Sequence, residues 1–113
     1  MALFLNGKQV VTVEDTECSV TLGSTMPSDM GSPTITRRGS VVLLSFGVNI
    51  PSGTYYDNTV LWTVEPAPLK TVQGAVRYGS SFTNIKINSN GTVTFNTQQS
   101  GNNWAVGEII YLV

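Results

Sequence analysis

FTNIKINSNGTVTFN, residues 82–96, is the stretch with the clearest structural pattern in the chain. Apolar residues alternate with polar ones on both sides of a central turn: Phe82, Ile85, Ile87, Val93 and Phe95. The turn contains Asn90-Gly91, and both residue types tolerate the positive φ that tight β-turns need. We therefore predict a β-hairpin with its tip at Asn90-Gly91 and with Phe82 and Phe95 in the core.

The rest of the chain repeats this pattern at fairly regular spacing. A small hairpin is expected around Asn6-Gly7, and further strands are expected at residues 18–22, 35–37, 41–50, 60–64, 72–78 and 104–113. No segment has a 3.6-residue apolar stripe of ten residues or more. The sequence thus predicts an all-β fold, an antiparallel β-sandwich or barrel.

Residues 23–33 are rich in Gly, Pro, Ser and Thr, which is typical of a loop or linker. We take this stretch as the internal boundary. Residues 1–33 are then an N-terminal hairpin arm with its linker, and residues 34–113 are the β-sandwich head domain.

Composition excludes several classes of chemistry. Only 12% of the residues are charged, the formal net charge is −1, and the chain has no His and a single Cys, Cys18. Ser-His-Asp and Cys-His systems, imidazole zinc sites and internal disulfides are therefore impossible. Six Lys and Arg residues and a pI near 5.1 argue against nucleic acid as a partner. No apolar run approaches 18 residues, no secretory signal is recognisable and no phosphate-binding loop occurs, so neither membrane insertion nor a cofactor is expected.

The C-terminal strand Ile109–Val113 is apolar at every position. It can be a central strand of the sheet. Alternatively, one of its faces meets other copies of the protein, because a free apolar end strand promotes aggregation. In that second case Ile110 and Leu112 are the interface residues.

Several features from residue 34 onward follow one another in a recognisable order. They are a hairpin at 35–48, the turn Ile50–Thr54, a proline stretch Glu65–Pro68, the hairpin 85–93, and a last strand that runs from Trp104 to Tyr111-Leu112-Val113. This order resembles the C-terminal head domains of bacteriophage tail-fibre and receptor-binding proteins. The resemblance implies a homotrimer in the virion, in the phage tail or baseplate, that binds saccharides of the host surface.

Saccharide binders place flat rings and a few polar groups around the sugar. Aromatic residues stand in polar, turn-rich surroundings at two places, and an Arg ends a nearby strand. We expect a shallow saccharide pocket from Tyr55, Tyr56, Asp57, Arg77, Asn102, Asn103 and Trp104. Each also has a plainer interpretation: a Tyr that packs back on the sandwich, an Asp57-Asn58 turn, a surface Arg, or a Trp that seals the barrel end. Trp62 lies among apolar neighbours and is expected in the core or between subunits.

Catalysis is not expected. Glycoside hydrolysis needs two carboxyl groups about 5 to 10 Å apart. Only Asp57, Glu65 and Glu108 lie in the head region, and only Glu108 has apolar neighbours in the sequence. The acidic residues at 14–17 lack the spacing of a calcium loop, so a solvated turn is expected there and no metal site.

Three functions are compatible with these observations. The first is a phage adhesion head that is a homotrimer, binds a host saccharide and contacts other tail proteins through residues 1–33. The second is a structural phage subunit of the baseplate, neck or capsid decoration. The third is a small enzyme or binding module of a cell.

Overall fold

The computed structural model describes residues 2–5, 8–11 and 17–113, and this part of the chain contains strands and no helix. The prediction of an all-β fold is confirmed. The strands are β1 (Ala2–Leu5), β2 (Lys8–Val11), β3 (Ser19–Leu22), β4 (Thr34–Arg38), β5 (Val41–Ile50), β6 (Thr54–Tyr55), β7 (Trp62–Glu65), β8 (Val72–Tyr78), β9 (Ser81–Ile87), β10 (Thr92–Phe95), β11 (Gln99–Ser100) and β12 (Asn103–Leu112). Within the described residues, no helix could cross a membrane.

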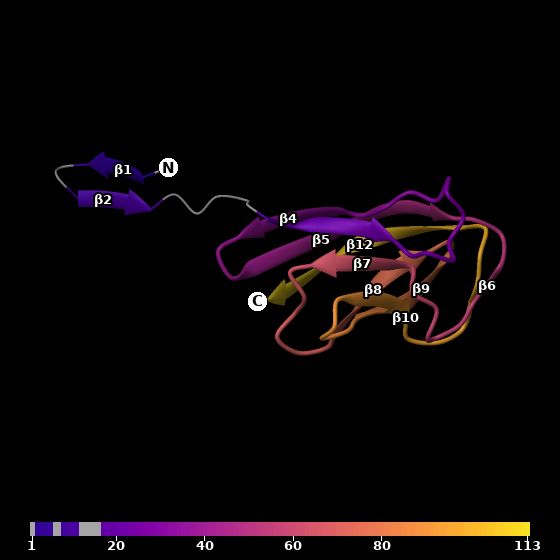
Figure 1. The fold of residues 1–113 in the computed structure, drawn as a ribbon. Helices are drawn as coiled ribbons and strands as arrows, with labels where there is room; N and C mark the ends of the chain where they lie inside the picture. Colours follow the sequence, from indigo (N-terminus) through magenta and orange to yellow (C-terminus); the bar gives the residue numbers. More distant parts are fainter. Residues whose placement is uncertain (1, 6–7, 12–16) are drawn as a thin grey trace.

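Eight of these strands form one antiparallel sheet in the order β3-β7-β10-β9-β8-β12-β5-β4. The sheet curls into a nearly closed barrel (Figure 1), and its two edge strands approach each other where Cys18 Sγ donates to the carbonyl of Ile35 at 3.8 Å. β1 pairs with β2, and β6 pairs with β11, as two small separate sheets. The Asn6-Gly7 turn expected between β1 and β2 lies outside the described residues.

The hairpin β9–β10 is the element on which the sequence was most informative. Gly91 has φ +92° and its N–H donates to the carbonyl of Asn88 at 2.8 Å, so the predicted tip at Asn90-Gly91 is confirmed. Phe82, however, is 74% exposed, and its prediction as a core residue is wrong. The side chains that point into the barrel are at odd-numbered positions of β9, and a strand places even-numbered neighbours on the other face.

The core fills the barrel and takes in the segment that precedes β4. Trp62 is fully buried against Phe46, with ring centroids 5.8 Å apart, so of the two positions expected for it, the core and a subunit contact, it takes the core. Its indole N–H donates to the carbonyl of Gly31 at 3.0 Å, and Met30 is also buried. Since β3 pairs with β7 as well, the barrel begins at Ser19, ahead of the boundary expected at residue 33.

β12 is a central strand, as the plainer interpretation of the C-terminus held. It pairs with β5 over its whole length and with β8 at Ala105 and Val106. Its inward side chains are buried, whereas the outward side chains are exposed: Trp104, Val106, Glu108, Ile110 and Leu112. The strand therefore presents an outer face with four large apolar side chains to solvent.

Candidate functional site

The two loops expected to form a saccharide pocket do lie side by side at one end of the barrel. β6 pairs with β11, and the N–H of Gly101 donates to the carbonyl of Gly53 at 2.7 Å. A Cβ on Gly101 would stand 1.8 Å from the carbonyl oxygen of Pro51, so this approach requires glycine. Asn102 follows with φ +64°, a conformation that Asn adopts more readily than most residues.

The side chains of these loops nevertheless diverge. Tyr55 is buried, stacks edge-on against Phe95 at 6.2 Å, and donates its hydroxyl to the carbonyl of Pro51 at 2.7 Å. Burial, and then the charge of Asp29, raise the pKa of Tyr55. Its ring belongs to the core and offers no face to a sugar, which corrects the expectation for this residue. Tyr56 is 54% exposed in a turn, where its N–H donates to Thr59 Oγ1 at 3.0 Å.

The other predicted residues are distributed over four places on the surface. Asp57 lines a hollow beside β9 and β10. Asn103 lines a different hollow with Tyr78, whose hydroxyl donates to the carbonyl of Ser100. Arg77 and Trp104 lie on the exposed outer face of β8 and β12. Asn102 is exposed in the turn ahead of β12. The seven residues thus do not line one common cavity.

The outer face of β9 and β10 carries a continuous row of polar side chains that the sequence did not single out as a site. We call it the polar strip, and it consists of Asn84, Lys86, Asn88, Thr92, Thr94 and Asn96, of which Thr94 is buried. Lys86 lies opposite Thr94, and the N–H of Asn96 donates to the carbonyl of Asn84 at 3.0 Å. Alternation along the strands explains the strip, because the positions between these residues supply the core.

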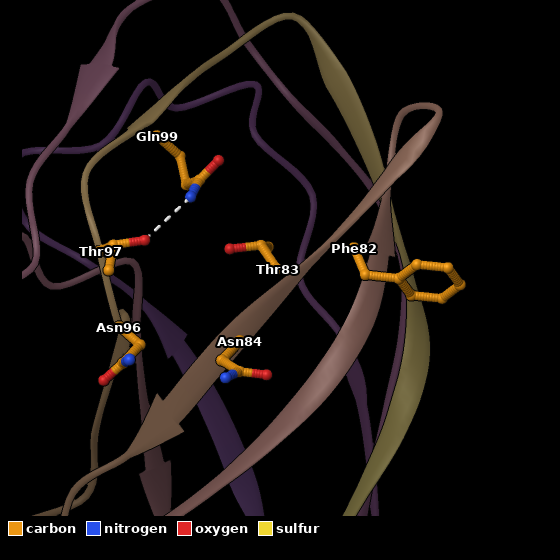
Figure 2. Close-up of a pocket in the computed structure, with 6 residues that line it drawn as sticks. All are labelled: Phe82, Thr83, Asn84, Asn96, Thr97 and Gln99. Carbon is orange, nitrogen blue, oxygen red and sulfur yellow. Dashed lines mark hydrogen bonds between the residues drawn. The ribbon is translucent and has the colours of Figure 1, made fainter.

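One end of the polar strip opens into a hollow of about 270 Å³ (Figure 2). Its lining is made of Phe82, Thr83, Asn84, Asn96, Thr97 and Gln99. Gln99 Nε2 donates to Thr97 Oγ1 at 3.2 Å, which holds the far wall. Figure 2 shows the Thr83 hydroxyl directed into the hollow and the Phe82 ring directed away from it, at the edge. Amide and hydroxyl groups therefore line this hollow beside one exposed aromatic ring.

The other end of the strip lies in a second hollow, of about 360 Å³. Here Asp57 and Lys86 bring opposite charges to the same cavity. Asn88 Nδ2 donates to the carbonyl and hydroxyl oxygens of Thr92, at 3.0 and 3.1 Å, and Asn90 Oδ1 accepts from the Thr92 hydroxyl at 2.7 Å. These bonds fix the amides of Asn88 and Asn90 in place, so that the Asn88 oxygen and the Asn90 nitrogen can serve a ligand.

A row of exposed side chains crosses three strands and meets the strip at Phe82. Arg77 on β8 lies opposite Phe82 on β9 and opposite Val106 on β12. Trp104 is 54% exposed, and the N–H of Gly79 donates to its carbonyl at 3.0 Å, so it is a diagonal neighbour of Arg77. These four residues, Arg77, Phe82, Val106 and Trp104, form one exposed row. Two of them, Arg77 and Trp104, were predicted as sugar contacts.

These surfaces favour binding by hydrogen bonds and ring contacts. Asp57 is the one carboxylate among the residues that line the two hollows. No group of three or more His, Cys, Asp or Glu side chains that could hold a metal ion occurs in the part of the chain that the structure describes. What the hollows supply is a set of amide, hydroxyl and ammonium groups at fixed spacing.

Comparison of the chain with protein-family models, with curated proteins and with solved structures found no match.

Proposed function

We propose that this domain is the head of a bacteriophage adhesion device, carried in the virion tail or baseplate, that binds a host-surface saccharide without catalysis. The observation that carries the proposal is the polar strip, which ends beside the exposed ring of Phe82. The order of hairpins and strands in the domain resembles that of phage heads, and this resemblance supports the same function.

The chemistry of the strip suits sugar hydroxyls, which both donate and accept hydrogen bonds. Asn side chains do the same through one amide, and Thr adds a hydroxyl that also does both. Lys86 and Asp57 can take the strongest bonds, because charged partners roughly double the strength of a hydrogen bond. The face of the exposed Phe82 ring can contact the apolar face of a sugar at one end of the strip.

The length of the strip favours an extended chain of sugars over a single ring. β9 rises about 3.3 Å per residue, so the distance from Phe82 to Asn88 is about 20 Å. Each hydrogen bond to a sugar contributes only about 1 kcal/mol net, since it replaces a bond to water. One head should thus bind weakly, with a Kd of about 1 mM, and adhesion would depend on several linked heads.

The test is binding of the full chain to an array of bacterial surface polysaccharides and to whole candidate host cells. Asn84→Ala and Lys86→Ala should each weaken the signal at least fivefold and leave the melting temperature unchanged. The control is Thr36→Ala, an exposed change on the outer face of β4. If the two strip variants fold normally and bind as the parent and the control do, the strip is not the binding site.

A structural phage subunit without glycan binding is the second candidate function. The observation in its favour is the exposed apolar face at the C-terminal half of β12, where Ile110 and Leu112 are 63% and 57% exposed. This alternative predicts no signal on any polysaccharide and binding to purified tail or capsid proteins instead, with residues 1–33 as a contact.

A further inference from the structure

An apolar groove of about 360 Å³ lies on the outside of the barrel, between β8 and the C-terminal half of β12. Its lining consists of Leu69, Lys70, Val72, Ile110, Tyr111 and Leu112. The pairing of β12 with β8 covers Ala105 and Val106, and the N–H of Leu69 donates to the carbonyl of Leu112 at 3.0 Å. The groove is therefore the wedge left where the two strands separate, with its far end closed by that backbone bond.

The side chains around this groove are strongly exposed for their type. Leu69, Ile110 and Leu112 are 71%, 63% and 57% exposed. Lys70 is the one charged residue in the lining. Exposed apolar side chains gathered around a groove mark an interaction surface in a soluble domain. Among the described strands, β1 and β2 pair only with each other and with no strand of the barrel.

The chain carries a segment that needs such a surface. β1 and β2 pair with each other, Leu3 opposite Val10 and Ala2 opposite Val11, as a separate two-stranded sheet. Their sequences, ALFL and KQVV, are mostly apolar. A two-stranded hairpin is only marginally stable alone in water and needs a further apolar surface to pack on.

The β1–β2 hairpin precedes the part of the barrel that lies near the groove. Cys18 contacts the carbonyl of Ile35, and its proximity to Tyr111 adds to the effect of burial on the pKa of that residue. Tyr111 itself lines the groove. In Figure 1, β1 and β2 lie beyond the barrel end that carries the β4–β5 turn and the C-terminus. The β1–β2 hairpin of one molecule thus lies beyond the same barrel end as its C-terminus, beside which Leu112 lines the groove.

We propose that the groove receives the β1–β2 hairpin of a second copy of this chain. Donor and acceptor are then different surfaces of each molecule, so the contact is head-to-tail and closes into a ring when the rotation between copies permits. Ile110 and Leu112 are interface residues in this arrangement, where they form part of the acceptor.

The experiment uses full-length variants and measures mass by sedimentation at micromolar concentration. The donor variant is Leu3→Asp with Leu5→Asp, and the acceptor variant is Ile110→Asp. The control is Thr54→Asp, an exposed strand position on β6 away from the groove lining. The parent and the control should sediment at two or more times 12.1 kDa, and the donor and acceptor variants at 12.1 kDa.

Mixing the two defective variants is the decisive step. Each retains the half that the other lacks, so the mixture should recover a two-chain species of twice 12.1 kDa. A monomeric parent, a donor variant that keeps the parent's mass, or a mixture that stays monomeric would each overturn the proposal. If Ile110→Asp does not fold, Leu69→Asp replaces it, because Leu69 is 71% exposed and lies outside the strands.

Discussion

Replacing Phe82 with Ala should separate recognition from stability. The ring is 74% exposed at the edge of the Figure 2 hollow, so its loss removes little packing from the folded state. Surface changes of this kind usually alter the free energy of unfolding by no more than about 0.5 kcal/mol. We therefore expect Phe82→Ala to melt within a few degrees of the parent.

The effect on binding can be worked from the area of the ring. A sugar that covers one face of Phe82 removes about 40–50 Å² of apolar surface from water, and each Å² is worth about 25 cal/mol. The product is about 1 kcal/mol, which corresponds to a five- to tenfold weaker Kd for a single head. In an assay with linked heads the loss is larger, because every site contributes to the avidity.

The assay is a titration of the polysaccharide that gives the highest array signal, followed by calorimetry, with parent, Phe82→Ala and Trp104→Ala. Trp104 lies on β12, two strands from β9 and about 10 Å away, so its removal should change the Kd less than twofold. An unchanged Kd for Phe82→Ala would refute the reasoning. If Trp104→Ala alone weakened binding, the site would lie on β12 and the loops, as the sequence first indicated.

Three further predictions concern the fold. Burial raises the pKa of Tyr111 to about 12, above its value near 10 in the unfolded chain, so the contribution of this residue to the free energy of unfolding should be constant below pH 10 and be lost between pH 10 and 12. This loss of stability is at most about 2.7 kcal/mol, and solvent screening makes it smaller. Chemical denaturation at several pH values should show a smaller loss in Tyr111→Phe than in the parent. Trp62→Ala removes a fully buried ring and the bond to Gly31, so urea denaturation should show a loss of about 3–5 kcal/mol, and a loss below 1 kcal/mol would contradict the described core. Gly101→Ala would push a Cβ into the Pro51 carbonyl, so thermal melting should show clear destabilisation, whereas Ala at the exposed, open Gly47 should be mild by comparison.

The sequence predicted those parts of the fold that depend on local pattern. Alternation and turn residues identified the strands, and Asn90-Gly91 is at a hairpin tip because Gly91 needs a positive φ. The prediction that Phe82 is a core residue was wrong because successive side chains of a strand point to opposite faces. Ile85 and Ile87 point into the barrel, so the even-numbered Phe82 on the same strand points outward. Alternation counted back from Ile85 and Ile87 alone predicts that Phe82 lies on the outer face of the barrel.

The candidate site was harder to predict, because it depends on contacts between distant segments. Tyr55 looked like a loop residue, yet pairing of β6 with β11 turns its ring onto Phe95. The polar strip had a local signal, since Asn84, Lys86 and Asn88 alternate with core residues. That signal marks only a solvated face. The hollow beside Asp57 exists because the segment before β7 runs alongside β10, where the N–H of Leu61 donates to the carbonyl of Val93, and no local pattern reveals this contact.

The outer face of β12 ties the two proposals together. Folding needs its inward side chains, Ala105, Ile109 and Tyr111, and nothing in the barrel requires Ile110 or Leu112 to be apolar. Large apolar side chains at exposed positions of a central strand therefore support the proposed interaction surface. The groove they line lies between β8 and β12, whereas the polar strip lies on β9 and β10, further along the same sheet. A hairpin seated in the groove would leave the strip of every copy free, so assembly would multiply weak sugar contacts without covering them.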